Sequence, residues 1–347
     1  MENADKGALR LTVGMALSVA IAWGVGLEAA FMAPVMTVTL LAKPGPPVPL
    51  VKGAVLGFLV AGLLLAGVLT VPILKNFPVS GVLVTSVLFY TVTYASARKA
   101  NPLTLFMHVA LVFIPTAGVA NQAATTLLAR TTGVALVIGV LASAVAHALF
   151  PDAPEPAKAA AAPAGASPEA AGWLALQATL IVMPMFMLAL SNPAFYLQGV
   201  MKTVGLGQQA GATTARTAGR ELAGSTLVGA VLAMLIWSGL SLRPNLWMFA
   251  LWTAAASLWI GVRMFGVKAT PFGRSYWLNA MMSLFFVLGP AITDSANGDD
   301  AYRAGVVRVT LFVLVALYAS TVVKVLERWR ASRSRSLLLE PGLGTST

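Results

Sequence analysis

The chain has 347 residues, of which 58% are hydrophobic and 10% are charged, and its mean hydropathy is +0.82. A soluble domain carries about 25% charged residues, so this composition excludes an ordinary soluble fold. With no cysteine the chain forms no disulfide and no thiolate metal site, and its two histidines argue against a histidine-based metal centre.

Apolar segments predict an all-α polytopic membrane protein with about twelve transmembrane helices. A bilayer core about 30 Å thick is crossed by roughly 20 helical residues. The predicted spans are 9–26, 28–42, 50–74, 78–97, 102–119, 124–150, 173–190, 193–210, 214–240, 244–265, 272–290 and 302–329. The second and eighth spans are also compatible with broken or re-entrant helices, which membranes tolerate where protein or water covers the backbone.

A proline- and alanine-rich segment divides the chain. Residues 151–172 hold five prolines and ten alanines without apolar periodicity, and this composition predicts a cytoplasmic linker. The linker separates a first six-helix repeat (1–150) from a second six-helix repeat (173–330), and we expect residues 331–347 to form a basic flexible tail.

The two halves carry similar features in the same order. Lys52 opens a glycine-rich third span, Arg220 opens a glycine-rich ninth span, and equivalent features lie about 164 to 178 residues apart. Six spans per half give both halves the same orientation, which predicts parallel repeats related by a pseudo-two-fold axis along the membrane normal. Small residues at near-helical spacing predict close packing and a central position for the third and ninth spans. These residues are Gly53, Gly57, Gly62, Gly67, Gly224 and Gly229.

The Lys and Arg residues divide unequally between the two sides of these spans. Eighteen of the 23, Lys202 among them, are assigned to one side, and the other five are Lys75, Arg130, Arg243, Arg303 and Arg308. Because cationic loops are retained in the cytoplasm during insertion, both termini are predicted to be cytoplasmic. The net charge of +11 then belongs to loops beside anionic headgroups, and we expect no nucleic-acid partner.

Arg130 and Arg308 run against this trend at equivalent points of the two halves. Ionisable residues at membrane depth usually face the bundle interior or a water-filled cavity, so the pair is a candidate for binding an anion near the pseudo-axis. The alternative is anchoring at the outer headgroups. Asn121 and Gln122, in the turn before the sixth span, would donate amide hydrogen bonds to the anion or cap a helix.

Four further positions are candidates. Lys52 and Arg220, at the cytoplasmic ends of equivalent spans, would attract the anion or extend to the headgroups. His108 in the fifth span and Glu28 between the first two spans would carry a coupling proton. The alternatives are a neutral histidine hydrogen-bonded to a neighbouring helix and a solvated loop carboxylate.

Common catalytic patterns are missing from the sequence. It has no Walker A loop, no HExxH zinc motif and no GxSxG elbow. We therefore expect no ATP-driven pumping by this chain alone, no enzyme activity and no cofactor.

The chain resembles the fusaric acid resistance and aromatic acid exporter superfamily, in a compact form without the large cytoplasmic domains. The resemblance rests on Leu-Arg-Leu-Thr at 9–12, on Lys52-Gly53 and Arg220, and on Ala129-Arg130 opening a sixth span that Pro151 closes. It implies an exporter of small aromatic or carboxylate compounds, driven by the proton-motive force. It also implies a periplasmic adaptor protein of the membrane-fusion type as a partner.

These features lead to one expected function and two alternatives. We expect a multi-pass secondary transporter of the bacterial inner membrane that binds small organic anions between its two halves and exports them. A passive anion channel and a non-transporting membrane subunit of an export complex are the alternatives. The expected partners are the organic anion and the lipid bilayer, and self-association into a homo-oligomer is left open.

Overall fold

The computed structural model describes residues 2–42, 45–99, 101, 103–151, 165–210, 219–296 and 301–339. These residues form helices joined by turns, and no strand occurs among them. The helices of the first half are α1 (Asn3–Gly24), α2 (Met32–Leu41), α3 (Leu50–Gly67), η1 (Val68–Thr70), α4 (Val71–Asn76), α5 (Pro78–Lys99), α6 (Thr104–His108), η2 (Val109–Phe113), α7 (Ile114–Ala120) and α8 (Gln122–Leu149). Those of the second half are α9 (Pro168–Ser191), α10 (Pro193–Ala210), η3 (Gly219–Ala223), α11 (Gly224–Leu242), α12 (Leu246–Met264), α13 (Arg274–Ala296) and α14 (Ala301–Leu339).

Each predicted span coincides with one helix or with a short series of helices. Nine helices of the described residues are long and apolar enough to cross a membrane, in agreement with a polytopic membrane protein. The apolar segments Met32–Leu41 and Thr104–Ala120 are shorter, and α10 is not among the nine. The twelve crossings, their direction and the internal repeat therefore stay predictions.

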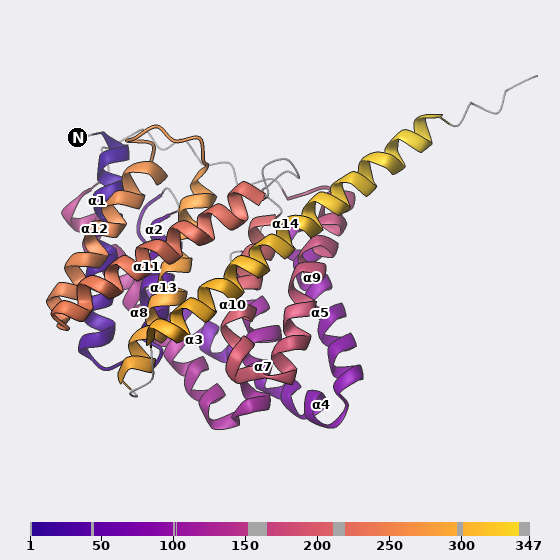
Figure 1. Cartoon of the computed structure of the whole chain (residues 1–347), viewed down its shortest axis with the longest axis horizontal. Coiled ribbons are helices and arrows are strands. Elements are labelled where there is room, and N and C mark those ends of the chain that lie inside the picture. Colours follow the sequence, from indigo (N-terminus) through magenta and orange to yellow (C-terminus); the bar gives the residue numbers. More distant parts are fainter. Residues whose placement is uncertain are drawn as a thin grey trace, which may run out of the picture.

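Two helices extend beyond the boundaries predicted for the linker and the tail. α9 begins at Pro168, inside the predicted linker, because Ser167 caps the helix by accepting a hydrogen bond from the Ala170 amide at 3.3 Å, and proline suits the first helical position. The linker residues 152–164 lie outside the described residues. α14 continues to Leu339, so the first part of the predicted flexible tail is helical, and Figure 1 shows this end of α14 projecting beyond the bundle.

Two long contacts join the first half of the chain to the second. α1 packs along α12, and α5 packs along α9. Under the predicted repeat, α1 corresponds to α9 and α12 corresponds to α5, so a two-fold relation between the halves would exchange these two contacts. The two halves therefore contact each other on two sides of the bundle, through α1 with α12 and through α5 with α9. Helices of both halves surround the space between them.

Of the nine span-length helices of the described residues, α13 is the most enclosed, not α3 or α11. In the apolar 18-residue stretch of each helix, 78% of the α13 residues are buried. The corresponding share is 28% for the segment that begins with α3 and 39% for the segment Arg220–Leu242. The predicted central position of the third and ninth spans is therefore wrong. Gly53 and Gly57 do pack closely, against α8, but a Cβ atom on Gly62 would meet nothing within 4 Å. Gly53 and Gly57 thus belong to the packed face of α3, and Gly62 does not.

Large apolar side chains cover the outer surface of the bundle. Phe58, Leu69, Val79, Leu242 and Trp247 are each more than two-thirds exposed. A water-soluble protein seldom exposes apolar side chains on this scale. Helices also satisfy their backbone hydrogen bonds internally, as a hydrocarbon environment requires. This surface is suited to contact with lipid.

Candidate functional site

A lysine lies at the centre of the bundle. The Lys202 side chain of α10 is only 1% exposed. Its Nζ donates to Asn279 Oδ1 at 2.9 Å and to Ser283 Oγ at 2.5 Å, both on α13. Both acceptors are neutral, and within the described residues no carboxylate pairs with Lys202. The protonated form of a lysine held only by neutral oxygens has no described charge to compensate it.

The hydrogen bonds continue from α13 to α11. Asn279 Nδ2 donates to Ser225 Oγ at 2.6 Å, and this hydroxyl donates in turn to the Glu221 carbonyl oxygen. Asn279 thus accepts from Lys202 with its oxygen and donates to Ser225 with its nitrogen, so both ends of the amide are engaged. The network holds the Lys202 side chain among three helices, α10, α11 and α13.

The assignment of Lys202 to a cytoplasmic loop is therefore wrong. Its position in the middle of the apolar segment 193–210 was a sequence signal for a membrane-embedded cation. The unequal distribution of cations between the two sides does not reveal that signal, because it concerns only cations in loops.

A small apolar cavity is lined by residues next in sequence to members of this network. It has a volume of about 30 Å³ and lies between helices of both halves. Its walls are Met32, Val35 and Met36 of α2, Leu105, Phe106 and Val109 of α6 and η2, Thr132 of α8, Met201 and Gly205 of α10, and Met282 and Phe286 of α13. Met201 precedes Lys202, and Met282 precedes Ser283, so α10 and α13 each supply both a wall of the cavity and a member of the polar network.

The cavity walls match under the predicted repeat. α2 supplies Met32 and Met36, and 169 residues later α10 supplies Met201 and Gly205. In the same way Leu105 and Val109 stand 177 residues before Met282 and Phe286. Each pair spans one helical turn, and both separations fall within the range predicted for the repeat. This pattern is expected of a cavity on the axis that relates the halves.

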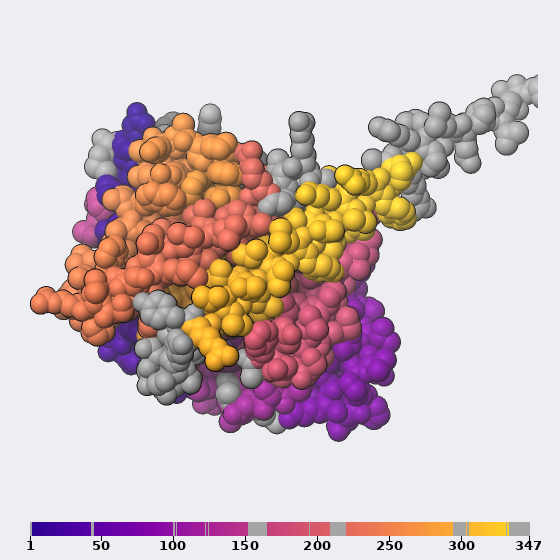
Figure 2. Space-filling model, viewed as in Figure 1, coloured from indigo at the N-terminus to yellow at the C-terminus, as the bar shows by residue number. Residues whose placement is uncertain are grey.

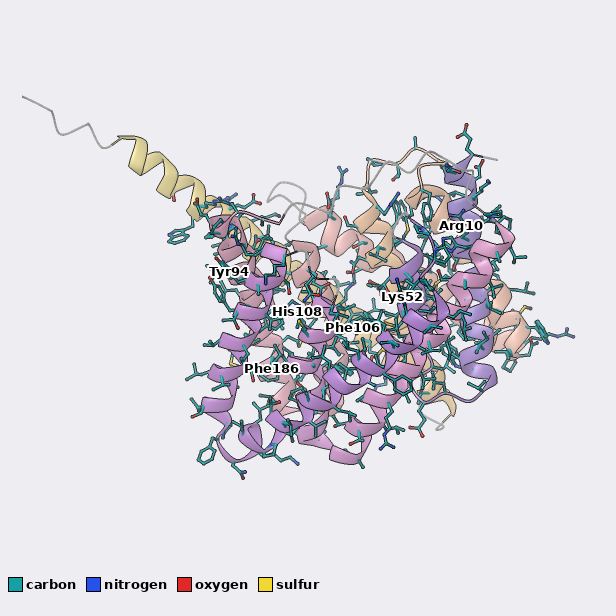
Figure 3. All side chains as sticks on the ribbon, turned by 180° about the vertical axis from the view of Figure 1, so that it is seen from behind. Arg10, Lys52, Tyr94, Phe106, His108 and Phe186 are labelled. Atoms are coloured by element: carbon teal, nitrogen blue, oxygen red, sulfur yellow. The ribbon has the colours of Figure 1, made fainter. Side chains whose placement is uncertain are left out.

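His108 lies beside α10, the helix that carries Lys202. It is 1% exposed and stacks on Phe89 with ring centroids 4.2 Å apart. Its Nε2 lies 2.8 Å from Thr93 Oγ1, and Gln208 Nε2 of α10 lies 3.3 Å from its Nδ1. Because the Thr93 hydroxyl donates to the Phe89 carbonyl oxygen, the pattern fits a neutral imidazole with its proton on Nε2. Figure 3 shows His108 and Phe106 within the bundle.

The two predicted anion-binding arginines lie on helices with different neighbours. Arg130 is an exposed residue of α8, which packs mainly on α1, α2 and α3. Arg308 is partly buried on α14, which packs on α9, α10 and α13. No described contact joins the two side chains. Their shared role stays a prediction, and neither residue lines the cavity.

The remaining predicted residues lie around the edges of the bundle. Lys52 is exposed in the first turn of α3, and Arg220 is exposed with its guanidinium 4.9 Å from the centre of the Phe272 ring. Glu28 is exposed in the turn between α1 and α2. The Asn121 side chain accepts a hydrogen bond from the Ala123 amide at 3.0 Å, as a helix-capping residue does. The side chain of Gln122 lies outside the described residues.

Residues 7–149, which comprise nearly all of α1 to α8, match a known family model. The family is described as proteins of unknown function, DUF2955. The match covers less than half of the chain and ends where the first predicted repeat ends. No curated protein and no solved structure matches the chain. The predicted resemblance to aromatic acid exporters therefore stays a prediction.

Proposed function

We propose that this protein is a secondary transporter that exports small organic anions across the bacterial inner membrane, driven by the proton-motive force. The single observation that carries the proposal is Lys202, an ammonium group buried among apolar helices with only neutral hydrogen-bond acceptors. Ionisable residues within membrane helices usually mark a transport pathway.

An organic carboxylate suits this site. Its negative charge would compensate the ammonium, and a charge-assisted hydrogen bond is stronger than the neutral ones that Lys202 makes here. Its apolar part would lie against the methionine and phenylalanine walls of the neighbouring cavity. Methionine side chains adapt to irregular ligands because they are unbranched and flexible. The expectation of an aromatic carboxylate comes from the sequence resemblance.

We interpret the small cavity as the closed form of the proposed binding site. A volume of about 30 Å³ is far below the roughly 300–1,000 Å³ of a pocket for a drug-sized ligand. Loading would therefore require the helices of the two halves to separate around α2 and α10. Such rocking about a central site is how repeat-built transporters alternate access.

His108 is the described candidate for proton coupling that lies nearest this site in the fold. Gln208 connects its ring to α10, the helix that carries Lys202. A movement of α10 would break or remake this hydrogen bond and change the environment of the imidazole. We assign no comparable contact to Glu28, which is exposed in its turn.

A flux assay tests the proposal. The full-length protein is reconstituted in proteoliposomes, a pH gradient is imposed, and movement of labelled benzoate and related acids is followed. Wild-type protein should move the acid faster than its passive permeation, which empty liposomes under the same pH gradient record. Lys202→Met should lower this protein-dependent initial rate at least about tenfold, as expected for loss of a charge-assisted bond. Lys75→Met, which removes an exposed lysine of α4, is the matched control and should transport normally.

The two alternatives give different results in this assay. A passive channel would pass the anion only downhill, and a protonophore would leave that flux unchanged. A non-transporting subunit would give no flux above that of empty liposomes with any acid tested. Equal rates for wild type and Lys202→Met would remove the buried lysine from the mechanism.

A further inference from the structure

A large groove lies on the outside of the bundle, and Lys202 is not among the residues that line it. It has a volume of about 530 Å³ and lies between α9, α10 and α14. Pro184 and Leu188 of α9 form one side, Phe195 and Thr203 of α10 form the floor, and the stretch 306–318 of α14 forms the other side. In Figure 2, α14 in yellow borders the rose-coloured surface of α9 and α10.

The chemistry of the groove favours an apolar occupant. Its wall is almost entirely apolar. Three of its hydroxyl groups already donate to backbone carbonyl oxygens: Thr203 to Val200 at 2.7 Å, Thr310 to Val306 at 2.9 Å and Tyr318 to Leu180 at 2.7 Å. A polar ligand would therefore find few donors here, whereas a hydrocarbon chain would lose nothing by entering.

The shape of the groove is held by a contact between α9 and α14. Pro184 has no N–H, so the carbonyl oxygen of Leu180, one turn earlier in α9, loses its helical partner. The Tyr318 hydroxyl of α14 supplies the missing hydrogen bond at 2.7 Å. This bond joins the two sides of the groove at its inner end and holds α14 beside α9.

The length of the groove matches one leaflet. The lining residues of α14 run from Val306 to Tyr318, which is about 18 Å at 1.5 Å per residue. Half of the bilayer hydrocarbon core is about 15 Å. The groove begins near Ser191 and Pro193, where α9 ends and α10 starts, and near the start of α14. It therefore runs from one membrane surface, the outer one in the predicted topology, toward the midplane.

A cation precedes the groove-lining stretch of α14. Arg303 is exposed and lies one turn before Val306 and Val307 on α14. It is also one of the five cations on the side that carries few of them. Long cationic side chains near helix ends reach the headgroup region, so Arg303 stands at the depth of lipid phosphates while the groove below it is apolar.

We propose that this groove binds one acyl chain of an anionic phospholipid of the outer leaflet, whose phosphate interacts with Arg303. The apolar wall, the leaflet-length groove and the cation at its mouth are together complementary to that lipid. The proposal concerns a different surface from the lysine site and does not depend on transport.

A quenching experiment tests this lipid site. The chain has no cysteine, so a single cysteine can carry a bimane label on the full-length protein in liposomes. Leu314→Cys places the label in the groove, and Leu317→Cys places it on α14 outside the groove, at similar exposure (59% and 48%). Bromine on lipid chains quenches bimane nearby, and brominated phosphatidylglycerol is compared with brominated phosphatidylcholine.

At position 314 we expect half-maximal quenching at about fivefold lower mole fraction of phosphatidylglycerol, the selectivity that one arginine near the surface provides. At position 317 the two lipids should quench alike. Arg303→Gln should remove the selectivity at 314, and Arg303→Lys should keep it. Coincident curves at position 314 of the otherwise unchanged protein would overturn the proposal. So would the absence of quenching at 314 when 317 is quenched, which would mean that a non-lipid occupant or a second copy fills the groove.

Discussion

At the scale of single residues, the chemistry of this protein centres on a lysine that the bundle encloses. Taking an ammonium group out of water is costly unless it is well hydrogen-bonded. Lys202 has two hydrogen bonds, both to neutral oxygens of α13. Its cost to stability is therefore only partly offset, and such a residue is retained for function more readily than for folding.

Asn279→Leu tests how far the network supports this lysine. The change removes an acceptor of Lys202 and the donor to Ser225, and should lower the free energy of unfolding by about 1–3 kcal/mol. In the Lys202→Met background the same change should cost less, because no buried ammonium remains to lose its partner. Thermal unfolding of the full-length protein in detergent measures both. If Asn279→Leu lowered the free energy of unfolding equally in the wild type and in Lys202→Met, the coupling of the two side chains would be contradicted.

Sequence analysis of single residues could not predict contacts between residues that are far apart along the chain. Sequence placed His108 inside the bundle, and it is buried there with partners on α5 and α10. It did not single out Lys202, whose acceptors lie 77 and 81 residues away. The position of Lys202 within 193–210 was a readable signal, but nothing local to that segment shows that Asn279 and Ser283 face it, so the partners of the lysine are seen only in the folded bundle.

At the scale of elements, close helix packing depends on a few small residues. A Cβ atom on Gly57 of α3 would lie 2.9 Å from Val137 Cγ2 and 3.1 Å from the Gly133 carbonyl oxygen of α8. Gly133 faces Gly57 in turn, so the two helix backbones approach each other closely there. Gly62, one and a half turns further along α3, has open space beside it.

Gly57→Val should therefore destabilise the fold where Gly62→Val should not. The added side chain at 57 forces α3 away from α8, and overpacking of this kind costs about 1–3 kcal/mol. The melting temperature and the monodisperse yield of the two variants in detergent provide the comparison, with both variants changing the same residue type in the same helix. Equal destabilisation by the two substitutions would contradict the α3–α8 contact.

The elements themselves were well predicted, and their depth in the bundle was not. Apolar length located a helix at every predicted span, but it could not show that α13 is enclosed while α3 and α5 face outward. Both kinds of helix are apolar all round, because lipid and protein interior select similar side chains. At the linker, the Ser167-Pro168 pair was a readable helix start that the surrounding alanines and prolines obscured.

At the scale of the whole molecule, the sidedness of the loops has a direct test. Both termini are predicted to be cytoplasmic, which places the turn after α11 outside and the turn after α12 inside. Ser241→Cys should then react with a membrane-impermeant maleimide on intact cells, and Ala269→Cys should react only after permeabilisation. Both positions are exposed, so each variant is a control for the other. Labelling of Ala269→Cys on intact cells, with Ser241→Cys labelled only after permeabilisation, would invert the predicted topology and the proposed direction of transport.

The interlocked halves give the transport proposal its geometry. α1 with α12 and α5 with α9 hold the outer sides together, while α2, α6, α10 and α13 meet around the methionine-rich cavity. Lys202 lies on α10, its acceptors lie on α13, and His108 lies on α6. A change in the separation of the halves would alter the cavity, the network and the His108–Gln208 hydrogen bond together.

Equilibrium binding to the purified full-length protein tests the central claim, that Lys202 recognises a negative charge. A labelled aromatic monocarboxylate is titrated against wild type and Lys202→Met, with the corresponding amide as competitor. The account predicts one site in the wild type, affinity at least about tenfold lower in Lys202→Met, and little competition by the amide. Equal affinity of the two proteins for the acid, or an amide that competes as well as the acid, would contradict it.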